Sequence, residues 1–400
     1  MDDERLLGAD PGDPYPTYAA LRAQGRVLWY EESGQWLIPH HRDVTALLRD
    51  RRLGRTYLHR FTHEEFGRTP PPAAHEPFHV LNDNGLLDLE APRHTRIRRL
   101  VSKAFTPRRV AELRPYIEEL AGELVAGLVA DGGGDLVARV AEPLPVAVIA
   151  QMLGVPEQDR HLLRPWSAAI CGMYELNPSE ETARAAVRAS VEFTEYLREL
   201  IAERRKNLGE DLISGLIAVH DEDGGRLTEQ EMISTAVLLL NAGHEATVNS
   251  TGNGWWALFR HPEQLAALRA GDVPLSTAVE ELLRYDSPLH LFERWVLEDI
   301  EVDDVEIPRG SEVALLFGSA NRDPAAFQDP DRLDLSRTDN PHVSLGGGIH
   351  YCLGAPLARL ELAASYSQLL HQAPNLRLTA EPQWKEGLVI RGVRELVVEV

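Results

Sequence analysis

The chain has 400 residues, of which 44% are hydrophobic, and a formal net charge of -21 at pH 7. This apolar content is ordinary for a globular protein with a large core. The acidic balance excludes general nucleic-acid binding as the main role, because such binding depends on Lys and Arg neutralising phosphates.

The ends and linkers of the chain indicate one cytoplasmic domain. The N-terminus, MDDERLLGADPGDPYP, has no basic stretch followed by an apolar one, so it is not typical of a signal peptide. No apolar run reaches the roughly 18 residues that span a bilayer. Because Ser/Gly-rich linkers and repeats are absent from the sequence, we expect a single domain over residues 1–400, with about the first 13 residues flexible. The protein is therefore expected to act away from membranes.

In chain order, the first third mixes short elements with loops. The patterns predict a helix over 15–24 and strands over 26–30 and 35–39. A polar, Pro-rich stretch over 69–84 predicts an irregular loop. From residue 93 to about residue 270 the apolar spacing is mainly helical.

The Pro-rich stretch contains His75-Glu76-Pro77-Phe78-His79, which has the spelling of a zinc-protease motif. That chemistry needs both histidines on one face of a helix. Pro77 disfavours a helix here, so we interpret the match as chance.

The longest predicted helix begins after Thr228, which forms a capping box with Glu231. Its pattern stops before Pro262, giving about 33 residues, or roughly 50 Å at the rise of an α-helix. Such a helix must cross the molecule, and its apolar middle should be buried. Gly243 lies at that middle, where a small residue allows a flat, bulky group to approach the backbone.

The last third adds a minor β portion. Thr277 and Glu280 predict a second capping box before a helix that ends near Tyr285. Strands are predicted over 293–298, 302–307 and 311–316, followed by a helix over 356–371 and terminal strands. The fold class is therefore mainly α with minor β.

The segment 344–361, SLGGGIHYCLGAPLARLE, carries the chemistry. Its glycines can form a tight turn close to a flat ligand. Cys352 follows at the N-terminus of the predicted helix, where backbone N–H groups and the helix dipole stabilise a thiolate. A thiolate is what a soft iron ligand requires.

This segment resembles the haem-binding loop of cytochromes P450, Phe-Gly-x-Gly-x-His-x-Cys-x-Gly followed by Leu-Ala-Arg. The matching positions are Gly346, Gly348, His350, Cys352, Gly354, Leu357, Ala358 and Arg359. The first position departs from the pattern, with Leu345 in place of Phe. A lone Cys is more often a buried apolar residue, but eight matched positions favour the haem loop. The resemblance implies the cytochrome P450 fold, with the long helix over haem b and Cys352 as axial iron ligand.

Further motifs resemble the same family. Glu281 and Arg284 lie three apart on one helical face and can pair. The resemblance implies a buried structural pair bonded to a downstream Arg, for which Arg332 is predicted. It also implies that the haem propionates, which are anions, are held by cationic side chains. Those residues are His94, Arg98, Arg294 and His350.

The middle of the long helix resembles the family's oxygen-binding segment, and Glu245 fits its acid. The next position is usually Thr, but here it is Ala246. Cleaving dioxygen needs two protons, which a hydroxyl at that position normally helps to deliver. Thr247 is rotated by about 100° along the helix and should face elsewhere. Three hypotheses remain: a substrate hydroxyl replaces the missing one, which we favour; Glu245 and water suffice; or the reaction needs fewer protons.

The resemblance implies a haem-thiolate monooxygenase that hydroxylates or epoxidises a medium or large apolar substrate, such as a natural product. Electrons would come from a separate ferredoxin and ferredoxin reductase, and dioxygen is the second substrate. An acidic ferredoxin would fit the basic segment over residues 93–109. That segment contains Arg93, Arg96, Arg98, Arg99, Lys103, Arg108 and Arg109.

The predicted substrate pocket combines several loops with the long helix. Asn241 is a polar group in an apolar stretch, which contacts either substrate or its helix neighbours. Cys171 and His244 are interpreted as ordinary packed residues. The rival functions are a peroxide-driven or radical-coupling haem enzyme and, outside catalysis, a haem-based ligand sensor. The pocket residues are Leu86, Leu87, Asn241, Ala242, Leu289, Phe292 and Ile390.

Overall fold

The computed structural model describes residues 10–175, 178–219 and 224–400. Most of the N-terminal segment that was expected to be flexible lies outside these residues. The chain divides into two compact units, each built from separated segments. Unit 1 comprises Met1–Gly54, Ile117–Leu144 and Ala246–Val400, and unit 2 comprises Arg55–Tyr116 and Pro145–Glu245. The expectation of one domain over 1–400 stays a prediction.

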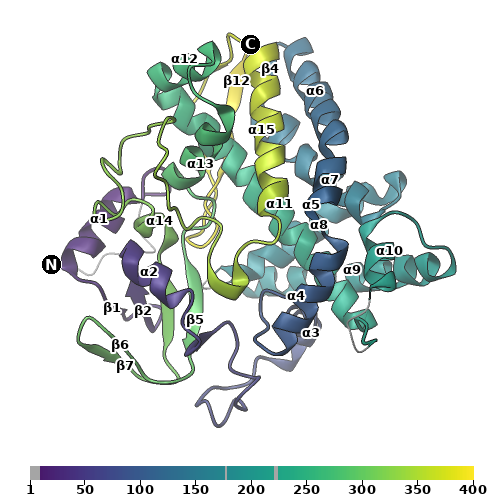
Figure 1. The fold of residues 1–400 in the computed structure, drawn as a ribbon, viewed down its shortest axis with the longest axis vertical. Helices are drawn as coiled ribbons and strands as arrows, with labels where there is room; N and C mark the ends of the chain where they lie inside the picture. The colour runs from purple at the N-terminus through teal and green to yellow at the C-terminus, as the bar shows by residue number, and fades with distance from the viewer. Residues whose placement is uncertain (1–9, 176–177, 220–223) are drawn as a thin grey trace. The chain divides into compact units, whose positions relative to one another are not determined.

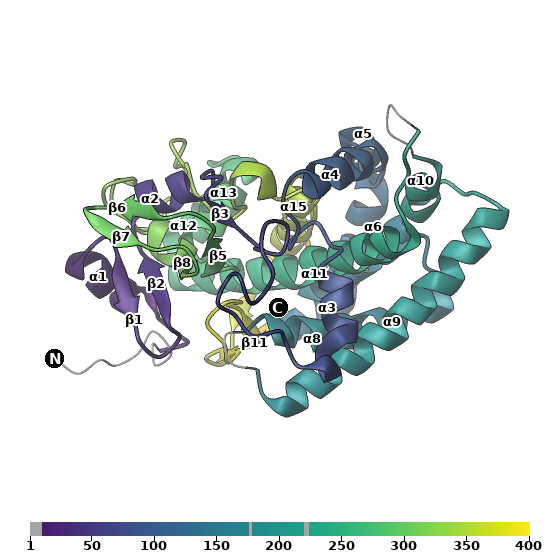
Figure 2. The same ribbon diagram turned by 90° about the horizontal axis from the view of Figure 1, so that it is seen from below.

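Unit 1 holds the β structure of the described residues. Its largest sheet has the strand order β1-β2-β8-β5-β3, in which β2 and β8 are parallel and the other pairs are antiparallel (Figure 2). The strands are β1 (Leu28–Tyr30), β2 (Gln35–Ile38), β3 (Leu53–Gly54), β4 (Gly133–Asp135), β5 (Phe292–Val296), β6 (Ile300–Val302), β7 (Val305–Ile307), β8 (Glu312–Leu315), β9 (Arg377–Leu378), β10 (Gln383–Trp384), β11 (Val393–Glu395) and β12 (Val397–Glu399).

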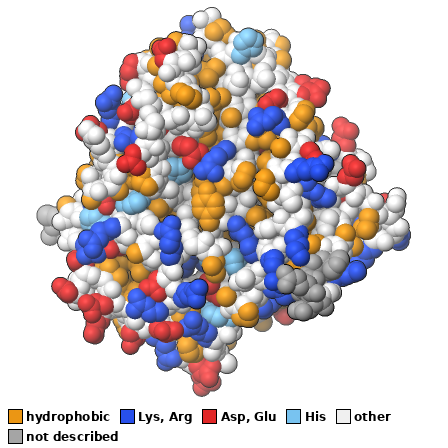
Figure 3. Space-filling view, in the orientation of Figure 1, with side chains coloured by type: hydrophobic (Ala, Val, Ile, Leu, Met, Phe, Trp, Pro, Cys, Tyr) orange, Lys and Arg blue, Asp and Glu red, His pale blue; other side chains and the backbone are white. Residues whose placement is uncertain are grey.

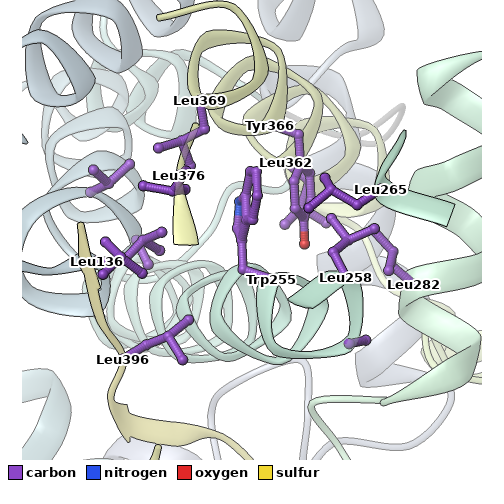
Figure 4. Close-up of a cluster of buried hydrophobic side chains, with 14 of the residues drawn as sticks. Leu136, Trp255, Leu258, Leu265, Leu282, Leu362, Tyr366, Leu369, Leu376 and Leu396 are labelled. Atoms are coloured by element: carbon purple, nitrogen blue, oxygen red, sulfur yellow. The ribbon is translucent and has the colours of Figure 1, made fainter. Parts of the chain in front are cut away.

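The helices of unit 1 surround an apolar core in which Trp255 and Tyr366 are fully buried (Figure 4). Gly254 is required beside them, because a Cβ atom there would lie 1.9 Å from the Tyr366 Oη. The helices are α1 (Tyr15–Gln24), α2 (His41–Leu47), α12 (Pro262–Ala270), α13 (Leu275–Tyr285), α14 (Phe317–Ala320) and α15 (Ala355–Gln372), with the short helices η3 (Val137–Ala141) and η6 (Gly348–His350).

Three helices pass from one unit into the other along the chain: α6 (Arg114–Ala130), α7 (Pro143–Leu153) and α11 (Glu229–Arg260). Within unit 1, α15 lies alongside α6 (Figure 1), and the Gln372 Nε2 donates to the Gly122 carbonyl over 3.2 Å. No helix among the described residues is long and apolar enough to cross a membrane.

The regular elements among the described residues of unit 2 are all helices, which are joined by turns and loops. Within it, the short helix α8 (Leu163–Cys171) packs against the long helix α9 (Glu180–Lys206) (Figure 2), with the rings of Trp166 and Phe193 stacked at 5.1 Å. The helices that lie entirely in this unit are η2 (Ala73–His75), α3 (Glu76–Asn82), α4 (Arg93–Ala104), α5 (Pro107–Glu112), η4 (Glu157–Leu162), α8 (Leu163–Cys171), η5 (Gly172–Tyr174), α9 (Glu180–Lys206) and α10 (Leu212–Ala218).

The long helix agrees closely with its prediction. α11 begins after Thr228, whose backbone N–H donates to Glu231 over 2.9 Å, while the Glu231 N–H donates to the Thr228 hydroxyl over 3.2 Å. This reciprocal capping box satisfies two amide donors that the helix leaves unpaired. The mainly α class with minor β is confirmed.

Two local predictions were wrong at least in part. The stretch 69–84 contains α3, because Pro77 occupies the first turn, where no helical hydrogen bond needs its missing N–H. The predicted strand over 302–307 is interrupted, because Val302 ends β6 and Val305–Ile307 form β7, with Asp303 and Asp304 at φ of 55° and 61° in the turn between them. Positive φ at both central residues gives the twist that a two-residue hairpin favours.

Candidate active site

The loop that leads to Cys352 is held by side chains of unit 1. The Ser344 hydroxyl donates to the Leu283 carbonyl of α13 over 2.7 Å, which fixes the start of the loop. The Cys352 N–H donates to the Leu345 carbonyl over 2.9 Å, which closes it. Gly348, at φ 63°, cannot be replaced without strain, since a Cβ atom there would lie 2.3 Å from the Leu48 carbonyl oxygen.

Cys352 is half-buried and lies three residues before α15, as the sequence predicted. Gly354 caps the helix, and the Ala358 N–H donates to its carbonyl over 2.9 Å. The N-terminal end of the helix dipole favours a negative charge on the sulfur. The donor chemistry therefore fits a thiolate-ligated iron.

A buried ionic group supports this loop. Glu281 and Arg284 are both fully buried on α13 and form a two-point pair, with N–O distances of 2.7 and 2.8 Å. The third side chain is Arg337, whose Nε donates to Glu281 over 3.1 Å.

The prediction that Arg332 completes this group is therefore corrected. Arg332 is exposed and contributes only its backbone carbonyl, which accepts from Arg284 over 3.3 Å. The main chain turns between these residues so that the Asp334 N–H donates to Glu281 over 2.9 Å. That turn brings Arg337, rather than Arg332, to the carboxylate.

Glu280 does not cap α13, contrary to the second capping-box prediction. The helix begins earlier, at Leu275, and Glu280 instead accepts from Arg359 of α15 over 2.6 and 2.8 Å and pairs with His342 over 3.1 Å. Burial raises the pKa of Glu280, but the hydrogen bonds of Arg359 and His342 lower it to about 2. The matched Arg359 therefore ties the helix after Cys352 to the helix that carries Glu281.

The four residues predicted to hold propionates fall into two pairs. In unit 1, Arg294 of β5 is 3% exposed, with its guanidinium 4.6 Å from the Phe292 ring centre, and His350 is half-buried in η6. In unit 2, His94 is 2% exposed and Arg98 half-buried, four residues apart on α4. A buried guanidinium such as that of Arg294 suits an anionic carboxylate. The joint role of the four stays a prediction.

The middle of α11 has one open face. Ala242 is exposed and Glu245 and Ala246 are half-buried, at the three- and four-residue spacing of one helical face. The interpretation of Gly243 changes, because a Cβ atom there would lie 2.9 Å from the Ile149 Cδ1. Gly243 therefore lets α7 pack closely, and the face available to a flat group carries Ala242, Glu245 and Ala246.

Thr247 lies beside Glu361 of α15. Both are buried, at 4% and 1% exposure, and the Glu361 Oε1 has no hydrogen-bond partner in the described part of the chain. Burial raises the pKa of Glu361 to about 8, although a hydrogen bond with Thr247 acts in the opposite direction. The sequence did not predict this hydroxyl–carboxyl pair.

Two predicted pocket residues of unit 1, Leu289 and Ile390, lie opposite one another in an antiparallel bridge. A buried polar cluster flanks them: Asp286 accepts from Arg391 over 2.7 Å, and His290 shares a 2.8 Å hydrogen bond with Tyr18. The remaining pocket residues are buried or half-buried, apart from the exposed Ala242. They are Phe292 of unit 1 and Leu86, Leu87 and Asn241 of unit 2.

The basic segment lies on α4 and α5. Several of its charges are already paired: Arg96 with Glu231, and Arg108 with Glu112 over 2.8 Å. Arg99 and Lys103 are exposed. Figure 3 shows Lys and Arg side chains interspersed with apolar ones on the face that carries α4.

Comparisons with known proteins show which family this chain resembles over nearly its whole length. Residues 273–373 match the family model for cytochrome P450. The chain is 41% identical to cytochrome P450 monooxygenase PikC of Streptomyces venezuelae, over 99% of this chain and 93% of that protein. It is 37% identical to 6-deoxyerythronolide B hydroxylase of Saccharopolyspora erythraea, over 97% and 96%.

A solved structure of P450BioI, in complex with hexadec-9Z-enoic acid ligated acyl carrier protein, superposes with a TM-score of 0.89 at 35% identity, over 98% of this chain and 99% of that one. Identity at this level over nearly the full length, together with the cysteine loop and its supporting ion pairs, identifies the family. The chain belongs to the cytochrome P450 family and is a haem-dependent oxidoreductase of the monooxygenase type.

Proposed function

We propose that this monooxygenase hydroxylates or epoxidises a medium or large apolar natural product, with electrons supplied by a separate ferredoxin and ferredoxin reductase in the cytoplasm. The observation that carries the chemistry is Cys352, half-buried at the N-terminus of α15 in a loop that needs its glycines. The relatives' names support the substrate class, since they include 6-deoxyerythronolide B hydroxylase and a polyketide biosynthesis cytochrome P450, PksS. The exposed Arg99 and Lys103 support docking of an acidic electron donor.

The cofactor in this proposal is haem b. Cys352 would ligate the iron, and His94, Arg98, Arg294 and His350 would bind the propionates. When bound, thiolate-ligated haem activates dioxygen for insertion of one oxygen atom into the substrate. The residues of this chain bind and orient the substrate and supply protons.

The residues proposed to supply protons depart from the usual pattern at Ala246. Glu245 is half-buried on the open face of α11 and can hold and pass on a proton at its carboxylate. Ala246 has no hydroxyl to pass it further, and Thr247 pairs with Glu361 instead. We propose that a hydroxyl of the substrate, lying near the carbon that is oxidised, takes the place of the missing side chain.

The proposal is tested by titrating the purified ferric protein with hydroxylated and plain polyketides, terpenoids, steroids and aromatic acids while the haem absorption is recorded. A spin-state shift caused by one class identifies the class that displaces the water on the iron. A shift with hydroxylated members alone supports proton delivery by the substrate. If haem supplied in excess gives no bound absorption band, the assignment of Cys352 is wrong.

A second candidate, a peroxide-driven or radical-coupling reaction, is favoured by Ala246 alone, because such a reaction needs fewer delivered protons. Turnover with peroxide and none with ferredoxin electrons would select it. A protein that binds haem and yields no product with either supply would instead fit a ligand sensor.

A further inference from the structure

Two tyrosines of α1 belong to a buried polar cluster in unit 1 that the proposed chemistry does not use. The Tyr15 hydroxyl donates to the Asp286 Oδ1 over 2.7 Å, and the Arg391 Nε donates to the same oxygen over 2.7 Å. The Tyr18 hydroxyl shares a 2.8 Å hydrogen bond with the His290 Nδ1. Apart from Tyr15, each of these side chains is at most 6% exposed. Buried hydrogen bonds hold their segments in one arrangement, because breaking one leaves a buried polar group unpaired.

His290 receives this hydrogen bond as a neutral ring. Burial lowers the pKa of His290 to about 4, so at pH 7 one ring nitrogen can accept from the Tyr18 hydroxyl. The packing around the bond is tight, since a Cβ atom at Gly318 would lie 2.9 Å from both the His290 Nδ1 and the Tyr18 Cε2. The donor and the acceptor therefore have little room to move relative to one another.

The cluster lies directly behind two predicted pocket residues. Leu289 and Ile390 lie opposite one another in an antiparallel bridge, and the next residue after each of them, His290 or Arg391, belongs to the cluster. Successive side chains of extended backbone point to opposite sides. The exposures agree with this alternation, because Leu289 and Ile390 are half-buried whereas His290 and Arg391 are buried. One side of the bridge therefore faces the cluster, and the other keeps an accessible apolar surface.

The bridge has few backbone hydrogen bonds of its own. It is an isolated pair outside the strands of the described residues, in which the His290 N–H donates to the Val389 carbonyl over 3.0 Å and the Arg391 N–H donates to the Pro288 carbonyl over 2.9 Å. Two short paired segments are only marginally stable by themselves. The position of the bridge must therefore depend on the side chains behind it, where α1 and Asp286 hold His290 and Arg391.

We propose that α1 fixes the Leu289–Ile390 bridge as a wall of the substrate pocket, with Tyr18 as a positioning residue for substrate selection. Tyr18 acts through His290 on one side of the bridge, and Tyr15 acts on the other side through the carboxylate and the guanidinium of the cluster. A wall that is already ordered raises the affinity for ligands that fit it, because binding no longer bears the cost of ordering it. This inference rests on the proposed function and adds a determinant of selection that lies outside the pocket.

The test measures how much the bridge contributes to binding of a bulky ligand, without knowledge of the natural substrate. Imidazole and a series of N-substituted imidazoles of increasing bulk ligate haem iron through nitrogen and shift its absorption. The probes that contact the bridge are those that lose affinity in Ile390→Ala while imidazole does not. For these probes, the affinity relative to imidazole should fall about 5-fold in Tyr18→Phe, the equivalent of one lost hydrogen bond. Tyr15→Phe should change the same ratio in the same direction.

Tyr366→Phe is the matched control, because Tyr366 is a fully buried tyrosine of the same unit whose hydroxyl donates to the Ser250 carbonyl over 3.1 Å. A contact that serves stability alone predicts that Tyr18→Phe and Tyr366→Phe both lower the free energy of unfolding and leave the affinity ratio unchanged. The proposal expects the ratio to fall in Tyr18→Phe and not in Tyr366→Phe. Hydrogen–deuterium exchange of the peptides that contain His290 and Arg391 should likewise be faster in Tyr18→Phe alone.

The inference is overturned if no probe loses affinity in Ile390→Ala, or if the affinity ratio in Tyr18→Phe equals that in Tyr366→Phe. A protein that shows no absorption of thiolate-ligated haem with carbon monoxide would instead overturn the proposed function. The two failures are distinguishable, because the carbon monoxide spectrum of wild type does not depend on the bridge.

Discussion

Replacing Glu361 with Gln should make the protein more stable, and the gain should grow with pH. Glu361 is 1% exposed, and burial raises its pKa from 4.5 to about 8. The unfolded chain loses this proton near pH 4.5, whereas the folded protein keeps it up to about pH 8. The stability that is present below pH 4.5 is therefore progressively lost as the pH rises through the folded pKa.

The magnitude follows from the size of the pKa difference. Each pH unit between the two values costs the folded state about 1.4 kcal/mol. Between about pH 5.5 and about pH 7.5, wild type should lose about 3 kcal/mol relative to Glu361→Gln, which has no proton to release. Urea unfolding of the two proteins at both pH values measures this difference, and charges elsewhere cancel because they are common to both.

An infrared titration supplies an independent measurement. The stretching band of a protonated carboxylic acid should persist at neutral pH in wild type and be missing from Glu361→Gln. Thr247→Val removes the hydrogen bond that lowers the pKa, so it should move the titration of this band to higher pH. The reasoning is refuted if the variant's stability gain is the same at both pH values, or if the band disappears near pH 4.5.

Three further predictions concern other parts of the chain. Arg337→Met should lower the free energy of unfolding by about 3–5 kcal/mol, because it removes one partner of the buried Glu281. In the same urea assay, the free energy of unfolding of the control Arg332→Met should stay within about 0.5 kcal/mol of the wild-type value, because Arg332 is exposed. Burial lowers the pKa of His290 from 6.5 to about 4. The free energy of unfolding should therefore fall by about 3 kcal/mol as the pH is lowered from 6.5 towards 4. Thermal melts of His290→Gln should lack this loss. Ala246→Thr should leave haem binding and fold intact yet change the turnover rate or the fraction of electrons recovered in product; unchanged values on the true substrate would contradict proton delivery by a substrate hydroxyl.

The sequence predicted well those features that depend on residues close together in the chain. The capping box of Thr228 and Glu231, the position of Cys352 before α15, and the pairing of Glu281 with Arg284 are all set by spacings of four residues or fewer. Such spacings fix geometry through the helical repeat alone. The same local reasoning placed α1 and the main strands of the large sheet near their observed bounds.

Features that depend on how the chain turns were predicted less well. Arg332 was the partner predicted for Glu281, but the turn at Asp334 brings Arg337, five residues further along, to the carboxylate instead. Thr277 and Glu280 have the spacing of a capping box, but Arg359, 79 residues further on, provides a stronger partner for Glu280. A charged partner that lies far away in the sequence can therefore replace a local capping interaction, and no local sequence pattern predicts such a partner.

The environment of the buried polar groups was the feature that the sequence predicted least well. Glu361 follows Cys352 by nine residues, within a helix whose neighbouring residues Leu360 and Leu362 are buried, and its isolation among apolar side chains is the one signal that could have drawn attention to it. Natural proteins rarely bury a carboxyl group or an amide without full hydrogen bonding unless something else is gained. In this chain Glu361 and Asn241 lie on or against α11, the helix that also carries Glu245 and Ala246. The helix that lacks the usual hydroxyl thus carries one buried polar group, Asn241, and contacts another, Glu361 of α15, which is the pattern expected where a substrate or water, rather than a side chain, completes the hydrogen bonding.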